Sequence, residues 1–490
     1  MTMEIATAFV FEGYDMQSKI MRYIQRTVFV VMSAAFLSCV TTRTERTQEP
    51  AEGSATVPVA ANTVSDTAAV AFARNVKAAL DVQDMQRALS LFDTMPRELA
   101  DDVGLQVVHA SILVSAGRYA EAQEIVAALE RAGVAETDTL ELSAMIAAAS
   151  GDRRAERAAV QKILATDPTN AIANIQQAKE HALNKRYQLA AHSYERALKG
   201  QPDNTEALFG CAQMNYYVGK LKESEAYLHR LLELEPNNAY AFAYLGKLAA
   251  DDENYLRASR FVTQAIAADG MRPDFYLDLG VYERYQGHFD AAEDAWTKAI
   301  ALQPDYFLGY VYRGGLYSER ENYSRALADY LKVVEYNPKY YFAYEEIGVL
   351  QWHAQNWPAA RSAFLEALNY ASNNYAYMLM VAATYLKEKN TVEAKSYLAR
   401  AMRGRATNSL EYQMLRLYHD QGGTNAENNV MLNIEREANT TKKGKLRYYM
   451  GLYYDLKGSE KAANEFYLQA TSIQAPLFFE YRLAEWGLER

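Results

Sequence analysis

The sequence predicts an all-α protein in which helical hairpins of one length are repeated along most of the chain. Five prolines, Pro168, Pro202, Pro236, Pro304 and Pro338, are separated by 34, 34, 68 and 34 residues. Half of the 490 residues are hydrophobic and only 11 are Pro, which indicates abundant folded structure. A fixed period of this length is the signature of a solenoid, in which neighbouring repeats stack to bury one continuous core.

Residue size follows the same register from repeat to repeat. Small residues recur at Ala178, Ala212, Gly246, Gly280, Gly314 and Gly348, and again at Ala190, Ser224, Ala258, Ala292, Ala326 and Ala360. Large side chains follow at Tyr194, Leu228, Val262, Trp296, Tyr330 and Phe364. We expect the small residues to let two helices approach closely, so that Gly280→Leu would cost about 1–3 kcal/mol by overpacking. The residues expected to cap the following helices are Asn170, Asn204 and Asn238.

These spacings resemble the tetratricopeptide repeat, a family of helix–turn–helix units, and residues 274–305 and 341–370 match it especially well. The resemblance implies a right-handed α-solenoid. Weaker motifs extend the array over residues 69–477, as twelve repeats that include a degenerate stretch at 409–443. Residues 478–490 are predicted to form a capping helix, because an uncovered last repeat would expose its apolar face.

The first 38 residues are predicted to be a secretory signal peptide. Three basic residues between 19 and 26 precede an apolar run over 27–38. Twelve residues make about 18 Å of helix, which is too short to cross a bilayer core of about 30 Å. Because the residues before this segment include three acids, we expect translation to begin at Met16 or Met21.

The residue that follows the apolar run is Cys39, and the ending Phe36-Leu37-Ser38-Cys39 resembles a bacterial lipobox with mismatches at Phe36 and Leu37. The resemblance implies that Cys39 is acylated, with palmitate among its lipids, and anchors the protein in the cell envelope, on the periplasmic side or the surface. Soluble export after ordinary cleavage and retention as an uncleaved anchor are the alternatives. Residues 39–68, rich in Thr, Ala and Pro, are predicted to be a flexible tether.

Composition and motif content argue against several classes of protein. The net charge is −10 and no Lys/Arg block stands out, so a nucleic-acid partner is not expected. Two Cys exclude a disulfide framework, and Cys211 is expected to be a small apolar core residue. The sequence lacks the phosphate-loop, zinc-protease, nucleophile-elbow and dinucleotide motifs. We therefore expect no catalytic residue, no cofactor, no metal and no enzymatic activity.

In tetratricopeptide proteins a concave groove is lined mainly by the first helix of each repeat. Transferred residue by residue, the resemblance implies a groove formed by Phe209, Tyr216, Tyr217, Tyr240, Lys247, Leu277, Val281, Tyr285, Phe342, Val349 and Trp352. Aromatic anchors suit an amphipathic helix or an extended peptide, although each could instead pack against the neighbouring helix. The Lys and Asn clamp with which chaperone adaptors of this family grip a C-terminal carboxylate is missing.

The functional hypothesis is a protein–protein interaction scaffold that is anchored in the bacterial envelope and binds other envelope proteins or peptide segments. Two alternatives remain: a ligand-handling accessory lipoprotein that serves a transporter, and a structural part of outer-membrane assembly. The tyrosines add one expectation. Of the 37 Tyr, 34 follow Pro168, so we expect binding to concentrate in the C-terminal two-thirds of the chain.

Overall fold

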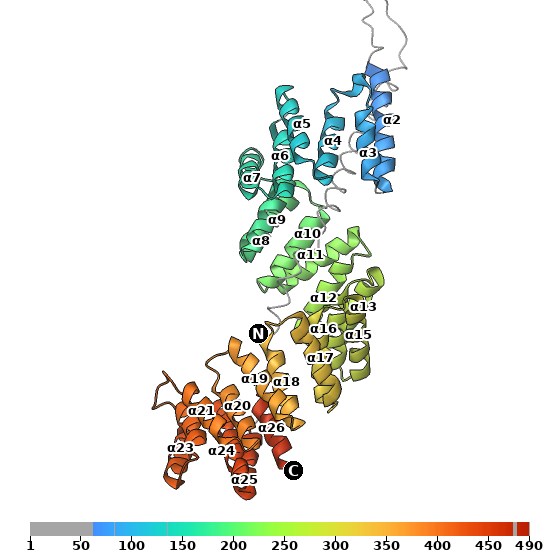
Figure 1. Ribbon diagram of the computed structural model, residues 1–490. Helices are drawn as coiled ribbons and strands as arrows, with labels where there is room; N and C mark the ends of the chain where they lie inside the picture. The colour runs from blue at the N-terminus through green and yellow to red at the C-terminus, as the bar shows by residue number, and fades with distance from the viewer. Residues whose placement is uncertain (1–61, 83, 135, 474–477, 490) are drawn as a thin grey trace, which may run out of the picture. The chain divides into compact units, whose positions relative to one another are not determined.

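The computed structural model describes residues 62–82, 84–134, 136–473 and 478–489. All regular secondary structure in these ranges is helical (Figure 1). The predicted signal peptide, the predicted lipidation site Cys39 and most of the predicted tether lie outside the described residues. The first described helix begins at Asn62, so the last part of the predicted tether belongs to this helix.

The first of two compact units is Met1–Pro236, and its described helices form consecutive antiparallel-type hairpins. They are α2 (Asn62–Asp81), α3 (Met85–Asp93), the short 3-10 helix η3 (Arg97–Leu99), α4 (Val103–Ser115), α5 (Tyr119–Arg131), α6 (Glu136–Ser150), α7 (Arg153–Thr166), α8 (Ala171–Leu183), α9 (Tyr187–Gly200), α10 (Thr205–Tyr217) and α11 (Leu221–Leu234). In each pair we call the helix nearer the N-terminus the first helix and its partner the second helix.

The second unit is Asn237–Arg490 and continues the same pairing (Figure 1). Its described helices are α12 (Ala239–Asp251), α13 (Tyr255–Ala268), α14 (Pro273–Tyr285), α15 (Phe289–Leu302), α16 (Phe307–Glu319), α17 (Tyr323–Tyr336), α18 (Tyr341–His353), α19 (Trp357–Tyr370), α20 (Tyr375–Lys387), α21 (Thr391–Ala401), α22 (Leu410–Asp420), α23 (Thr424–Arg436), α24 (Thr440–Leu456), α25 (Glu460–Thr471) and α26 (Phe479–Leu488).

Asparagine side chains begin several of the first helices, as the sequence predicts. The side-chain oxygen of Asn170 accepts a hydrogen bond from the backbone N–H of Ala173 at 2.9 Å. Asn204 and Asn238 cap α10 and α12 through equivalent bonds of 3.0 and 2.9 Å. These bonds satisfy a backbone donor that has no partner within the helix, which fixes where each helix begins.

The two helices of a pair meet where a small residue faces a large one. Trp296 on α15 is fully buried, and its indole Nε1 donates to the backbone oxygen of Leu277 on α14 at 3.1 Å. A Cβ atom placed on Gly280 would lie 2.3 Å from the same indole nitrogen. Glycine is therefore required at this position by the close approach of the indole ring, as the repeat register predicts.

The C-terminal part of the second unit, α18–α26, has additional contacts between helices that are distant in sequence. Helix α24 contacts α20 as well as α22, and α26 contacts α18 as well as α24 and α25. Lys387 Nζ on α20 lies 2.7 Å from Asp455 Oδ2 on α24. The Tyr449 hydroxyl oxygen on α24 lies 3.2 Å from the backbone oxygen of Ala376 on α20. The degenerate stretch 409–443, which contains α22 and α23, thus lies where first helices two pairs apart come into contact.

Candidate peptide-binding surface

Three predicted binding residues of the first unit, Phe209, Tyr216 and Tyr217, lie on α10 and are all partly exposed. The Tyr217 ring centroid is 5.0 Å from that of Tyr187 and 5.7 Å from that of Tyr216. Each of these two contacts holds the Tyr217 ring in place while part of its edge stays accessible. Tyrosines in this state can contact a partner with little further loss of side-chain entropy.

The second unit presents charged and aromatic residues together on α12 and α14. The Arg272 guanidinium lies 5.2 Å from the ring centroid of Tyr240, within the range of a cation–π interaction. Lys247 Nζ lies 3.8 Å from Asp278 Oδ2 and 5.3 Å from the Tyr244 ring. The predicted residues Tyr240 and Lys247 are both partly exposed, so the structure keeps both of them accessible on α12.

Asp278 is a residue of this surface that the sequence did not reveal. A quarter of its side chain is exposed, 25%, yet burial raises the pKa of its carboxyl, and the nearby Lys247 ammonium opposes that rise. Burial and the Asp278 charge together raise the pKa of Tyr312 on α16. A recessed carboxylate beside an ammonium can accept a hydrogen bond or bind a cationic side chain of a peptide. Asp278 directly follows Leu277, which the family resemblance assigns to the groove, but Asp278 itself does not occupy a groove position of the family.

Three further predicted residues remain accessible. Val281 is partly exposed, and Tyr285 is 60% exposed with its ring stacked on Tyr255 at 4.4 Å. Phe342 at the start of α18 is 47% exposed and stacks on Tyr341 at 4.2 Å. Large apolar rings held open to solvent in this way are suitable contact points for a partner.

Leu277, Val349 and Trp352 lie in the core, with exposed fractions of 6%, 0% and 3%. The expectation that these three side chains line an open groove is corrected by their burial. Trp352 packs against Trp357 of the same hairpin, with ring centroids 4.9 Å apart. These three side chains are covered by neighbouring helices, so they contribute packing rather than an accessible contact.

A partly buried polar cluster between α18, α20 and α26 was also missed from the sequence. The Tyr377 hydroxyl donates to Glu345 Oε2 at 2.5 Å, and Arg482 Nη2 donates to Glu346 Oε2 at 2.8 Å. Burial raises the pKa of Glu345 to about 7, although the Tyr377 hydrogen bond acts in the opposite direction. Burial also raises the pKa of Glu480 on α26. No local motif marks this cluster, because its members come from helices far apart in the chain.

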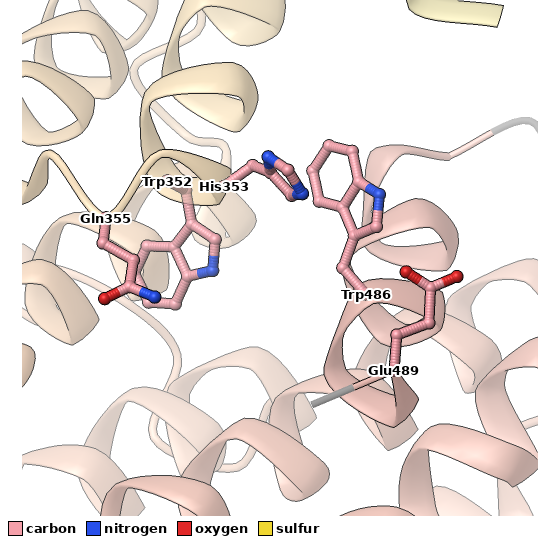
Figure 2. A pocket seen from close by; sticks show the side chains of 5 residues that line it. All are labelled: Trp352, His353, Gln355, Trp486 and Glu489. Carbon is pink, nitrogen blue, oxygen red and sulfur yellow. The ribbon is translucent and has the colours of Figure 1, made fainter. Parts of the chain in front are cut away.

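A cavity of about 220 Å³ lies beside this cluster and is lined by Trp352, His353, Gln355, Trp486 and Glu489 (Figure 2). The His353 ring points toward the Trp486 indole, with ring centroids 4.2 Å apart (Figure 2). The aromatic walls of this cavity and the single carboxylate, Glu489, suit a small apolar or cationic group.

The described residues contain no cluster of three or more His, Cys, Asp or Glu that could hold a metal ion. Among the same residues, no helix combines the length and the hydropathy that crossing a membrane requires. Cys211 is buried and free, as the sequence predicts, and burial raises the pKa of its thiol. A thiol of this kind packs as a small apolar group.

Family models described as tetratricopeptide repeat match three stretches of the chain, residues 181–248, 277–335 and 313–376. These stretches lie within the array that the 34-residue period predicts. Residues 181–248 and 277–376 are therefore tetratricopeptide repeats, and the described residues of the chain have the all-helical fold of an α-solenoid. Proteins with this fold are generally interaction scaffolds, which bind peptides or other proteins.

Similarity to curated proteins is confined to segments. The chain is 24% identical over 149 residues to the human protein O-mannosyl-transferase TMTC1, which is 30% of this chain and 17% of that protein. It is 23% identical over 110 residues to anaphase-promoting complex subunit 3 of Schizosaccharomyces pombe, which is 22% of this chain and 16% of that protein. The chain thus matches less than a fifth of either relative.

Solved structures of tetratricopeptide-repeat proteins are also similar to the chain. One from Parabacteroides merdae is 15% identical, covers 58% of this chain and 98% of its own, and has a TM-score of 0.35. The C-terminal part of a repeat protein from Cytophaga hutchinsonii is 15% identical, covers 58% of this chain and 100% of its own, and has a TM-score of 0.37.

Proposed function

We propose that this protein is a non-enzymatic scaffold of the bacterial cell envelope that binds partner proteins or peptide segments through its first helices. The observation that carries the proposal is the accessible set of aromatic and charged side chains on α12 and α14. Tyr240, Lys247, Asp278 and Tyr285 combine aromatic contact area with both signs of charge. The aromatic rings can anchor a bound peptide, and the charged side chains can fix its register along the surface.

Crosslinking in the native envelope, followed by identification of the trapped proteins, tests this binding surface. The variant Lys247→Glu/Tyr285→Glu should lose the partners that the wild type traps, because it reverses one charge and places another on an aromatic contact. Leu331→Glu is a matched control, since Leu331 is 48% exposed on the second helix α17. If the double variant traps the same partners as the wild type, the α12–α14 surface is not the binding surface.

The proposed anchor is an acyl group on Cys39, which the lipobox resemblance supports. The variant Cys39→Ala should fail to incorporate labelled palmitate and should leave the membrane fraction. Cys211→Ala is the matched control, because Cys211 is buried and its loss should leave the label unchanged. Undiminished labelling of Cys39→Ala would contradict the proposed anchor.

A second candidate, the handling of a small ligand on behalf of a transporter, is favoured by one observation. The cavity of about 220 Å³ between Trp352 and Trp486 has room for a small group against aromatic walls. Native mass spectrometry of protein purified from its own envelope distinguishes the two functions. A ligand that co-purifies with the wild type and is lost from Trp486→Ala would favour this candidate, whereas a bare protein would argue against it.

A further inference from the structure

The last helix, α26, does more than cover the final hairpin. Gly487 lies so close to α25 that an added Cβ atom would be 2.6 Å from the Tyr467 ring. On its other side, Arg482 bonds Glu346 on α18, and the Trp486 indole donates to the Tyr323 hydroxyl on α17 at 3.1 Å. A helix that only capped the array would need the contact with α25, but it would not need the contacts with α18 and α17.

The aromatic side chains of α26 lie against rings from earlier hairpins. Phe479 has its ring centroid 6.1 Å from those of both Phe364 on α19 and Tyr377 on α20. Trp486, seven residues later, packs edge-on against Tyr323 at 5.2 Å. Residues seven positions apart share one face of a helix, so α26 presents a single aromatic face to these hairpins.

The contact also buries a carboxyl group of α26. Glu480 has an exposed fraction of 0%, accepts a hydrogen bond from the Tyr449 hydroxyl at 3.1 Å and lies 3.8 Å from Lys445 Nζ. Removing charges from water costs free energy that such ion pairs only partly recover. Buried charges therefore make the α26 contact selective for its sequence, and they make it weaker than an apolar contact of the same size.

Some hydrogen-bonding groups at this contact are not used by α26. Among the described residues, the buried Tyr375 hydroxyl on α20 has no hydrogen-bond partner, and neither has the buried Nε atom of Arg482 on α26 itself. An unpaired buried polar group costs about 1–3 kcal/mol. A helix that paired with the Tyr375 hydroxyl would therefore fit the surface better than α26 does.

We propose that the surface formed by α18, α20 and α24 is a binding site for an amphipathic helix, and that α26 is its internal occupant. The partner would be a helix of another protein with two aromatic residues seven positions apart and, between them, an acidic residue followed by an arginine two positions later. This pattern is that of Phe479, Glu480, Arg482 and Trp486. The proposal rests on the proposed scaffold function and names a partner chemistry for it.

Binding of a peptide in trans tests the site on the full chain. The probe is a fluorescein-labelled peptide of residues 478–490, titrated with protein and followed by fluorescence anisotropy. Arg482→Glu and Gly487→Ala each loosen α26 by a different contact, so both variants should bind the peptide at least about tenfold more tightly than the wild type. The matched control is Arg320→Glu, which makes the same charge change at a residue paired with Asp290 and should bind like the wild type.

A charge exchange fixes the position of the peptide. Glu346→Arg added to Gly487→Ala should abolish binding of the natural peptide, because the introduced arginine repels the peptide's arginine at position 482, and a peptide with Glu at that position should restore binding. Equal affinity of the wild type, Arg482→Glu and Gly487→Ala would overturn the proposal, as would binding that ignores the charge at position 346.

Hydrogen exchange of the wild type tests the same idea without relying on the folding of a variant. The amides of α26 should exchange through local opening, about tenfold or more faster than those of α24. If α26 and α24 exchange together, α26 is a fixed part of the core and the proposal fails. The scaffold function is tested separately by crosslinking at α12 and α14, so it can stand or fail independently of α26.

Discussion

Two regions of the second unit, α12–α17 and α18–α26, use the same repeat positions for different purposes. Val281 on α14 is partly exposed, whereas Val349, two periods later on α18, has an exposed fraction of 0%. Arg284 on α14 is exposed and pairs with Glu319 at 2.7 Å, whereas its equivalent on α18 is the buried Trp352. The difference shows that the position in the repeat does not by itself decide whether a side chain can meet a partner.

The reason lies in contacts beyond the hairpin. In α18–α26 the first helices α20 and α24 pack on each other, and α26 packs on α18. Side chains that would face solvent in an evenly stacked array therefore become core. In α12–α16 the equivalent residues remain at an accessible surface, where the pair Lys247 and Asp278 keeps about a quarter of each side chain exposed, 27% and 25%.

The largest expected effect tests this comparison directly. Trp352→Ala should lower the free energy of unfolding by about 3–5 kcal/mol, because it removes a buried ring. Arg284→Ala, at the equivalent position of α14, should lower it by no more than about 1 kcal/mol, because an exposed ion pair contributes little. Urea denaturation followed by circular dichroism measures both. Similar losses for the two variants would mean that the regions do not differ in this way.

The second prediction concerns pH and the partly buried Glu345 of α18. Its folded-state pKa is raised from 4.5 to about 7, so the folded protein retains a proton that the unfolded chain has released between these values. Stability from this group is therefore full below about pH 4.5 and is lost as the pH rises toward 7. The charged groups that face it are Glu346, Glu480 and Lys445.

Glu345→Gln removes the ionisation and should stabilise the protein by about 2–3 kcal/mol at pH 8 but by less than about 1 kcal/mol at pH 5. Thermal or urea unfolding at the two pH values measures the difference. Glu366→Gln is the matched control, because Glu366 is exposed on α19 and its replacement should show no such dependence. A pH-independent effect of Glu345→Gln would show that the carboxyl is not held protonated in the fold.

The third prediction concerns the contact that both regions share. An added Cβ atom would lie 2.3 Å from Trp296 at Gly280 and 2.9 Å from Phe364 at Gly348. Gly280→Ala and Gly348→Ala should therefore each destabilise by about 1–3 kcal/mol. Gly314→Ala should be nearly neutral, because its nearest atom is at 3.3 Å and alanine favours the helix. If Gly280→Ala destabilises the protein and Gly348→Ala does not, the packing within the hairpins differs between the two regions.

The smallest expected effect concerns the accessible surface of α12–α14. Lys247→Gln should change the free energy of unfolding by less than about 1 kcal/mol, because its ion pair with Asp278 is long and partly solvated. The same variant should clearly reduce the yield of crosslinked partners, although its free energy of unfolding hardly changes. A loss of stability above 2 kcal/mol would instead show that this pair supports the fold.

The tyrosines show both what the sequence predicts and what depends on contacts between hairpins. The sequence predicts Tyr194 and Tyr330 at packing positions, and their exposed fractions are 5% and 6%; Tyr467 is buried in the same way, with 3% exposed. In the C-terminal region, buried tyrosines also donate hydrogen bonds to partners in distant helices, as Tyr377 does to Glu345 and Tyr449 does to Glu480. The sequence shows the excess of tyrosine, but which hydroxyl meets which carboxylate depends on contacts between hairpins.

The sequence by itself determined the repeat period, the asparagine caps and the pairing of Gly280 with Trp296, because these depend on residues within one repeat and the next. Only the tertiary structure decided that Arg482 meets Glu346, 136 positions away. Small differences in how successive hairpins stack accumulate over several repeats, and their sum brings α26 to α18. A sequence pattern within one repeat cannot predict this accumulated displacement. The partial exposure of Val281 and the burial of Val349 therefore follow from the folded array alone.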